Sequence, residues 1–259
     1  MRLLDVKNIT KTFGGLVAVD NLTFHVNEKQ IVSIIGPNGA GKTTTFNMIT
    51  GIYKLDNGEI WFDGKPIHSK TPQEIVKAGI ARTFQNIRLF KSMRVIENVL
   101  IGYHINDNYN LFDAIFRTKK YREEERKAHQ RCVEILESLD LAQYMDQDAK
   151  NLPYGLQRKI EIARAIATNA KLLILDEPAA GMNPQESESL MEFIFSLRDA
   201  GYTILLIEHD MSLVMNISDY IYVCEFGKLI AEGTPDQVAN DPRVIEAYLG
   251  KGGVDEDEG

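Results

Sequence analysis

Cysteine and long apolar runs are both scarce in this chain. Only 2 cysteines occur among 259 residues. Cys132 and Cys224 lack the spacing of metal ligands, so we interpret them as free thiols rather than as a disulfide or a nucleophile. The longest apolar runs, such as KLLIL and TILLI, fall far short of the roughly 20 residues that cross a bilayer. The chain is therefore not predicted to span a membrane.

Clustered basic charge is lacking as well. The net charge is -8, and the acidic stretch VDEDEG argues further against nonspecific nucleic-acid binding. The one charge-dense internal run, RTKKYREEERK at 117–127, mixes both signs at helical spacing, which favours a solvated helix face over a nucleic-acid patch. The first residues, MRLLDVKNIT, lack the basic and apolar regions of a secretory signal, so we expect a cytoplasmic protein.

The apolar runs that are present predict an α/β fold. IVSIIG, KLLILDEP and TILLIEHD are apolar almost throughout and rich in β-branched residues, which predicts strands covered on both faces of a parallel sheet. LLDVKNIT, LTFHV, EIWFDG and YIYVCEFGKLIAEG alternate more and are punctuated by turn residues, which predicts a second, smaller antiparallel sheet. From about Val95 to Ala167 the periodicity is mostly helical.

A phosphate-binding loop follows the first of these strands. The stretch GPNGAGKTT matches G-x-x-x-x-G-K-[ST], and the helical pattern TTTFNMITG overlaps its end. Glycines allow the backbone N–H groups to curl round phosphates, Lys42 can reach the β and γ oxygens, and Thr43 can ligate Mg²⁺. The predicted nucleotide contacts of this loop are Gly36, Pro37, Asn38, Gly39, Ala40, Gly41, Lys42, Thr43 and Thr44.

Polar residues follow the other two buried strands. Asp176 and Glu177 end KLLILDEP, and His209 follows TILLI, so all three are expected at one edge of the sheet. Asp176 would hold Mg²⁺, Glu177 would orient the attacking water, and an imidazole can donate to a phosphate oxygen. By itself, an Asp-Glu pair at a strand end is often only a helix cap, and a single His is often only a hydrogen-bonded polar residue. The phosphate loop in the same chain favours the functional interpretation of both.

Three further stretches have open interpretations. Gln85 in RTFQN could ligate Mg²⁺ and touch the attacking water, or be a surface amide. Phe13 in KTFGG could stack on a base or pack in a core. LPYGLQR precedes the helical pattern KIEIARAIA, which predicts a glycine-bearing turn at Gly155 and a helix start able to bind an anion.

Taken in order, these residues resemble the nucleotide-binding domain of ABC ATPases, over nearly the whole chain. The resemblance implies a RecA-like parallel-sheet core, an antiparallel β-subdomain and an α-helical subdomain, with ATP and Mg²⁺ as cofactors. It implies one domain over residues 1–250, with a helical subdomain at about 86–167. Residues 251–259 are expected to form an acidic, flexible tail because VDEDEG has little to bury. The matched positions are the adenine-stacking aromatic, Walker A loop, Q-loop, Walker B aspartate, catalytic glutamate and switch histidine, in the order Phe13, Gly36–Thr44, Gln85, Asp176, Glu177 and His209. The implied catalytic residues are Glu177, His209, Lys42 and Gln85, and the implied metal ligands are Thr43, Gln85 and Asp176.

The resemblance also explains the glycine-bearing turn. LPYGLQ aligns with the family signature L-S-G-G-Q, which faces the γ-phosphate of ATP held by the opposite subunit, so Tyr154 and Gly155 are expected to contact the partner's ATP. Pro153 replaces the signature serine, and a hydrogen bond to a charged group is worth about 1.5–3 kcal/mol. We therefore expect a weakened but working signature. In the D-loop AAGMNP, Asn183 replaces an aspartate and loses its charge.

Longer stretches, among them ARTFQNIRLFKSMRVIENVLIG and IAEGTPDQVANDPRVIEAYLG, look like the LivG-type ATP-binding proteins of branched-chain amino acid importers. This resemblance implies a peripheral protein at the cytoplasmic face of the membrane. It also implies a second, nonidentical ATP-binding subunit in a head-to-tail dimer, two permease subunits docking near residues 88–93, and a substrate-binding protein. Relatives for urea, amides or lipopolysaccharide export stay open, because ATPase motifs do not touch the cargo.

Two other classes fit less well. Soluble ABC ATPases acting on ribosomes or DNA generally carry two cassettes or a long coiled coil, and the sequence has no such repeat or heptad pattern. A GTPase would need an N-K-x-D element after the phosphate loop, and a kinase would leave His209 and the signature helix unexplained.

Overall fold

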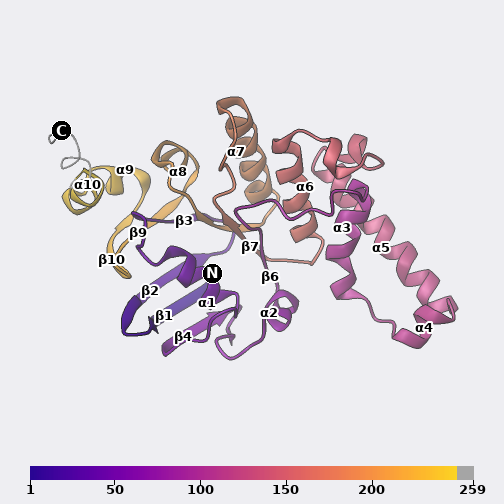
Figure 1. Cartoon of the computed structure of the whole chain (residues 1–259), viewed down its shortest axis with the longest axis horizontal. Coiled ribbons are helices and arrows are strands. Elements are labelled where there is room, and N and C mark those ends of the chain that lie inside the picture. Colours follow the sequence, from indigo (N-terminus) through magenta and orange to yellow (C-terminus); the bar gives the residue numbers. More distant parts are fainter. Residues whose placement is uncertain (250–259) are drawn as a thin grey trace. The chain divides into compact units, whose positions relative to one another are not determined.

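The computed structural model describes residues 1–249, so the predicted tail at 251–259 lies outside the described residues. The chain forms two compact units (Figure 1). The first unit comprises Met1–Ile75, Ile174–Glu177 and the chain from Ile194 onward, and the second comprises Val76–Leu173 and Pro178–Phe193. The phosphate loop belongs to the first unit, and the signature stretch belongs to the second.

An antiparallel sheet of four strands, in the order β2-β1-β4-β5, occupies the N-terminal part of the first unit. Its strands are β1(Arg2–Phe13), β2(Leu16–Asn27), β4(Asn57–Phe62) and β5(Lys65–Pro66). In β2 the alternate residues Leu22, Phe24 and Val26 are buried, because successive side chains of a strand point to opposite faces. The sheet predicted from the alternating runs is confirmed for these strands.

A second sheet has six strands in the order β10-β9-β3-β8-β7-β6. They are β3(Ile31–Ile35), β6(Ile80–Arg82), β7(Leu172–Asp176), β8(Thr203–Ile207), β9(Tyr220–Glu225) and β10(Lys228–Gly233). Every residue of β3, β7 and β8 is buried, as continuous apolar runs predict for strands covered on both faces. β3 pairs in parallel with both β8 and β9.

The assignment of YIYVCEFGKLIAEG to the smaller sheet was wrong. β9 and β10 do form an antiparallel hairpin, but β9 pairs in parallel with β3, with Val32 opposite Tyr220. Four consecutive residues, Ile221–Cys224, are buried, which is the pattern of a parallel-sheet strand. The turn residues between the strands favoured a hairpin correctly, but a hairpin pattern does not say which sheet it joins.

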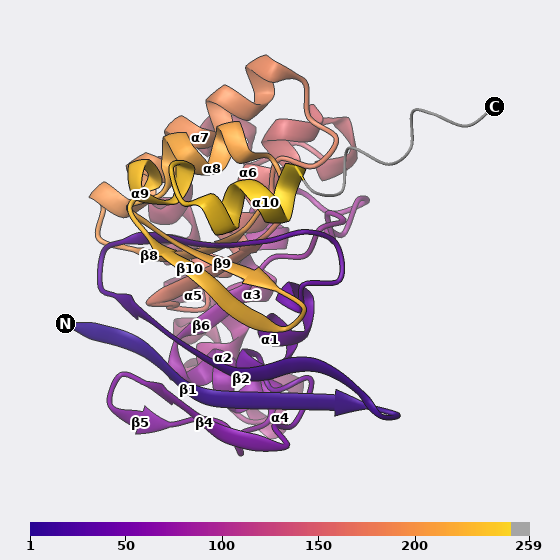
Figure 2. The ribbon, with the colours of Figure 1, turned by 90° about the vertical axis from the view of Figure 1, so that its left-hand side faces the viewer.

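Helices of the first unit cover the six-stranded sheet on the side of β9 and β10 (Figure 2). Apolar residues of β3, β9 and β10, among them Ile35 and Val223, pack with Val214, Val238 and Val244 of these helices in one buried cluster. The helices with residues in this unit are α1(Lys42–Ile49), α8(Met211–Ile217), α9(Pro235–Ala239) and α10(Pro242–Leu249), with α2(Pro72–Ala78) and α7(Pro184–Asp199) belonging partly to each unit.

The second unit is mainly helical, as the periodicity predicts. Its helices are α3(Val95–Tyr103), η1(His104–Asn106), α4(Leu111–Ile115), α5(Lys119–Ser138), η2(Ala142–Tyr144), η3(Ala149–Asn151) and α6(Tyr154–Ile166). α3 packs against α5 and α6, and a Cβ at Gly102 would collide with the Arg164 carbonyl oxygen, so only glycine allows this approach. Among residues 1–249, no helix has the length and apolar character needed to cross a membrane.

Candidate functional site

The phosphate loop joins β3 to α1 and begins at Gly36. A Cβ at Gly36 would collide with the Cys224 carbonyl oxygen, and one at Gly41 would collide with the Ala18 carbonyl oxygen. Gly41 also has φ +89°, a left-handed conformation that favours glycine. No side chain caps α1, so the first backbone N–H groups of this helix are available to an anion.

Lys42 is the first residue of α1 and lies inside the loop. Its Nζ donates to the Gly36 carbonyl oxygen at 2.6 Å and to the Pro37 carbonyl oxygen at 3.1 Å. Burial lowers the pKa of Lys42, and the nearby carboxylates of Glu177 and Asp176 partly oppose that shift. The ammonium is therefore held by two carbonyl groups that an incoming phosphate could replace.

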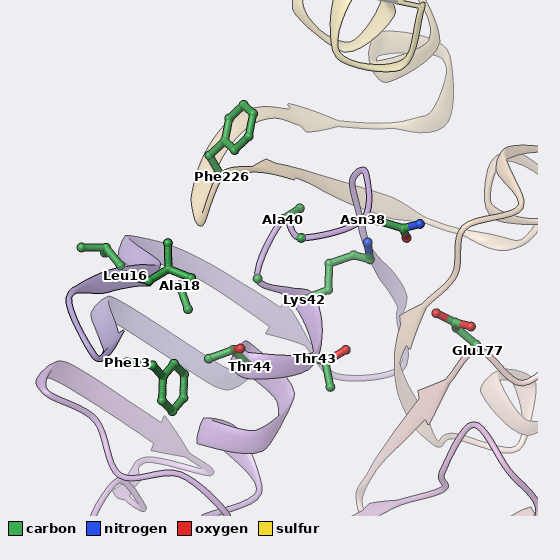
Figure 3. Close-up of a pocket in the computed structure, with 13 residues that line it drawn as sticks. Phe13, Leu16, Ala18, Asn38, Ala40, Lys42, Thr43, Thr44, Glu177 and Phe226 are labelled. Carbon is green, nitrogen blue, oxygen red and sulfur yellow. The ribbon is translucent and has the colours of Figure 1, made fainter. Parts of the chain in front are cut away.

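A cavity of about 510 Å³ opens beside this loop (Figure 3). Phe13 stands at its edge, 41% exposed, with its ring centroid 5.2 Å from that of Tyr53 in an edge-on contact. Phe226, in the turn between β9 and β10, also lines the cavity and was missed from the sequence. The signal for Phe226 was weak, because a single aromatic residue in a turn does not by itself indicate a binding site. The cavity is lined by Phe13, Leu16, Val17, Ala18, Asn38, Gly39, Ala40, Gly41, Lys42, Thr43, Thr44, Glu177 and Phe226.

The predicted carboxylate of Glu177 and imidazole of His209 lie close together, after the ends of β7 and β8. β7 ends at Asp176, which is buried, and Glu177 follows with φ +44°, an uncommon conformation for a residue other than glycine. The Glu177 N–H donates to the Ile207 carbonyl oxygen of β8 at 2.9 Å, which holds the two strand ends together. Nδ1 of His209 lies 3.6 Å from Oε2 of Glu177 and 3.8 Å from Oε2 of the buried Glu208. Glu208 was not predicted from the sequence.

Gln85 belongs to the second unit, in the loop after β6. Its backbone carbonyl accepts a hydrogen bond of 2.6 Å from Nη2 of Arg158 in α6. Arg158 is fully buried and also donates to the carbonyl oxygens of Phe84 and Pro178 and to the Glu161 carboxylate. Arg158 therefore holds the Q-loop backbone, a role that the sequence pattern of α6 does not reveal.

The expected glycine-bearing turn at Gly155 is instead part of a helix. α6 starts at Tyr154 with Pro153 as its N-cap, so Tyr154 and Gly155 are the first two helical residues. Proline suits this end of a helix because its fixed φ and missing N–H cost nothing there. The Gly155 N–H donates to Oε1 of Glu186 at 3.3 Å, and a cavity of about 270 Å³ adjoins this helix start.

Comparison with known proteins identifies the family. The model of the ABC transporter family matches residues 19–180, and a model of branched-chain amino acid ATP-binding cassette transporters matches residues 228–254. The branched-chain amino acid transport ATP-binding proteins BraF of Pseudomonas aeruginosa and LivG of Escherichia coli K12 are each 47% identical over 250 residues, which is 96% of this chain and 98% of theirs. The chain belongs to the ABC transporter family, as an ATP-binding protein of the branched-chain amino acid type.

Solved cassettes have the same fold. A nucleotide-free ATP-binding cassette from an ABC transporter superposes with a TM-score of 0.83, and a cassette in its ADP conformation with 0.84. Both are 38% identical, with 96% of this chain and 99% of theirs covered. The family and the fold class predicted from the sequence are therefore confirmed, as is the activity class, an ATPase of an ABC transporter.

Two further positions of this ABC cassette lie in the signature and in the D-loop. Leu156 occupies the glutamine position of the signature, a third departure that was missed, and it lines the 270 Å³ cavity. Asn183 was expected to act across a dimer. Within the chain its Oδ1 accepts from the Glu186 N–H at 2.9 Å, and the Glu186 carboxylate accepts from the Asn183 N–H at 3.3 Å. Asn183 therefore caps α7 within the chain, and its role across a dimer stays a prediction.

Proposed function

We propose that this cassette binds ATP in the 510 Å³ cavity and hydrolyses it to drive the import of branched-chain amino acids. The observation that carries the proposal is the gathering of Lys42, Glu177 and His209 around one phosphate loop within the first unit. BraF and LivG, the relatives that support the cargo, are both described as high-affinity branched-chain amino acid transport ATP-binding proteins.

The cavity fits a nucleotide in size and lining. Its volume of about 510 Å³ lies within the range of ordinary small-molecule sites, roughly 300–1,000 Å³. The exposed ring of Phe13 offers a face for adenine, while the N–H groups of the loop and of α1 offer donors for the phosphates. Lys42 would exchange its two carbonyl acceptors for phosphate oxygens. Because phosphate oxygens are charged, they compensate the desolvation of the ammonium better than carbonyl oxygens do.

The proposed ligands of Mg²⁺ are oxygen donors. The hydroxyl of Thr43, the carboxylate of Asp176 and the side-chain amide oxygen of Gln85 are hard ligands of the kind that Mg²⁺ prefers. Thr43 and Asp176 belong to the first unit and Gln85 to the second. When bound, Mg²⁺ supplies neutralising charge at the phosphate oxygens.

Glu177 and His209 have separate tasks. The Glu177 carboxylate, 23% exposed, accepts a hydrogen bond from the attacking water and orients it. His209 donates from a ring nitrogen to a γ-phosphate oxygen, and its position 3.6 Å from Glu177 keeps both groups on one side of the site. The left-handed backbone at Glu177 turns the chain abruptly at the end of β7, which places this side chain at the sheet edge.

The proposed partners rest on the resemblance to LivG-type cassettes. Tyr154 and Gly155 would face ATP held by a second, nonidentical ATP-binding subunit in a head-to-tail dimer. Two permease subunits would dock beside the Q-loop near residues 88–93 and receive cargo from a substrate-binding protein. In this stretch Leu89 is buried but Phe90 is 51% exposed, which leaves an apolar ring available to a partner. The cassette is then peripheral, at the cytoplasmic face of the membrane.

The test is to purify a tagged Glu177→Gln variant of the chain from its native membranes in the presence of ATP and Mg²⁺. Because the variant binds ATP but hydrolyses it at least about a hundredfold more slowly, the closed complex should persist. We expect mass spectrometry of the purified complex to identify a second cassette and two permeases. The same complex in proteoliposomes, carrying the wild-type residue, should take up leucine in an ATP-dependent manner.

Two controls sharpen the result. Lys42→Ala should lose nucleotide binding, whereas Glu28→Gln, at an exposed position of the first unit, should hydrolyse ATP like the wild type. Equal hydrolysis by wild type and Glu177→Gln would contradict the role of Glu177. Retention of ribosomal proteins, or uptake of urea or an amide in place of leucine, would contradict the importer or its cargo.

A further inference from the structure

A short helix of the second unit exposes an apolar face. α4 and the residue after it, Phe116, carry four large apolar side chains that are between 63% and 75% exposed. α4 lies beside the N-terminal end of α5, at the side of the helical unit away from α6 (Figure 1). We name this surface the α4 patch; its members are Leu111, Phe112, Ile115 and Phe116.

The α4 patch is one continuous helix face. At 100° per residue its four members fall within an arc of about 140°, and the intervening Asp113 and Ala114, on the opposite side, are only half-exposed. The rings of Phe112 and Phe116 contact each other, with centroids 4.5 Å apart. Large apolar side chains gathered in this way on a surface mark an interaction site rather than random exposure.

Contacts beneath α4 keep the patch facing outward. Asp113 turns inward, where its carboxylate accepts from the Thr118 hydroxyl at 2.9 Å. Tyr109 packs edge-on against Tyr121 of α5, at 5.0 Å between centroids, and its hydroxyl donates to Glu125 at 2.8 Å. The side of this segment that faces α5 is thus filled by polar and aromatic groups, and the apolar residues of α4 are left on the outer side.

Basic residues follow the patch directly. Arg117, Lys119, Lys120 and Arg122 are all exposed, on a chain whose net charge is -8. Lys119 lies 3.8 Å from Glu123, and among the described residues Arg117, Lys120 and Arg122 form no ion pair. Acidic residues lie in the same stretch, but residues 111–127 hold six basic against four acidic side chains, so the stretch carries a net charge of +2.

We propose that the α4 patch and these four basic residues bind the surface of an anionic phospholipid bilayer. Phe, Leu and Ile side chains beside Lys and Arg are the composition of helices that lie in a membrane interface, where rings enter the acyl boundary and cations meet lipid phosphates. The five-residue length of α4 permits contact with the interface and not a crossing. A symmetric pairing of two copies through this face would oppose the four basic residues to themselves, so charge disfavours a second copy.

This inference goes beyond the proposed function, in which the permeases alone attach the cassette to the membrane. Direct lipid contact would add a second attachment point on the helical unit. The lipid contact depends on neither the cargo nor the catalytic residues. The vesicle assay can therefore fail while the ATPase assays succeed, and the ATPase assays can fail while the vesicle assay succeeds.

The experiment is flotation of the purified full-length chain with vesicles of phosphatidylcholine alone or with about one third phosphatidylglycerol. We expect binding to the anionic vesicles that weakens steeply as salt is raised. Phe112→Ser/Phe116→Ser should reduce the partition constant at least tenfold. Lys120→Gln/Arg122→Gln should reduce it about fivefold for each charge removed, on anionic vesicles only.

The controls separate folding from lipid contact. Ile245→Ser removes another exposed apolar side chain, on α10, and should leave the partition constant unchanged. Each variant should bind ATP like the wild type, because none of the changed residues lines the nucleotide cavity. Equal flotation of wild type and both patch variants, or no flotation of the wild type, would overturn the proposal. It would also be overturned if the patch variants lost only their permeases in detergent, because the occupant would then be protein.

Discussion

Removing Arg158 from its buried ion pair with Glu161 should strongly destabilise the helical unit. Arg158 is 0% exposed and donates four hydrogen bonds, to the carbonyl oxygens of Phe84, Gln85 and Pro178 and to Oε2 of Glu161. The distances run from 2.6 to 3.1 Å, so each bond is well formed. Arg158→Met keeps most of the volume of the side chain but removes every donor.

The magnitude follows from what the substitution leaves behind. Glu161 is only 1% exposed, and without Arg158 its Oε2 loses its partner. Its Oε1 still accepts from the Arg88 N–H at 3.0 Å and lies 3.6 Å from Arg164. Removing one partner of a buried pair costs about 3–5 kcal/mol. For a chain of this size that should lower the melting temperature by roughly 10 °C. The loop at Gln85 also loses its anchor, so ATPase activity should fall more than nucleotide affinity.

The chain contains a matched control. Arg131 and Glu134 on α5 have the same i,i+3 spacing and lie 3.1 Å apart, but they are 51% and 47% exposed. Exposed helical pairs are worth about 0.2–0.5 kcal/mol, so Arg131→Met should hardly change the unfolding curve. Both variants are compared by urea unfolding at neutral pH. If Arg158→Met unfolds within about 1 kcal/mol of Arg131→Met, the reasoning about the buried network is refuted.

Two smaller predictions concern the thiols and the signature helix. Burial raises the pKa of both Cys132 and Cys224 to about 12, so a thiol reagent at pH 8 should label neither cysteine in the folded chain and both in denaturant. Because these pKa values are raised on folding, their contribution to stability is complete below about pH 8.5 and is lost as the pH rises toward 12; rapid labelling of the native chain would contradict this. Glu186→Gln removes the negative charge held by the Gly155 N–H, so a partner's phosphate should bind there more readily. In the Glu177→Gln background we expect half-maximal dimer closure at about two- to fivefold lower ATP concentration, and an unchanged or higher concentration would argue against competition at this N–H.

Much of the fold could be predicted because its signals are local. The buried strands β3, β7 and β8 correspond to continuous apolar runs in the sequence. The phosphate loop corresponds to a fixed spacing of glycines and a lysine. The polar residues after β7 and β8 meet because strand ends of a parallel sheet share an edge, which places His209 beside Glu177. Their catalytic and ligand roles remain predictions.

The failures have a common physical cause. The hairpin β9–β10 was assigned to the wrong sheet, because the choice depends on pairing between Tyr220 and Val32, far apart in the chain. The turn expected at Gly155 is helical, because Pro153 caps α6 directly and Glu186 from another segment accepts the Gly155 N–H. Pro153 is a local signal that was not used, whereas the partners Val32 and Glu186 lie far along the chain and leave no pattern within a short stretch of sequence.

The sequence by itself determined the fold class and the candidate phosphate site, because period, spacing and residue type act within a few turns or strands of the chain. The family was recognised from the resemblance of its ordered motifs to those of ABC ATPases. Only the tertiary structure decided that Arg158 anchors the Q-loop, that Glu186 holds the start of α6, and that the apolar residues of α4 face outward. Each of these depends on which distant segment supplies the partner for a buried charge, an N–H group or an apolar face. That choice is made by the packing of the whole chain, since burial requires every polar group to be satisfied at once.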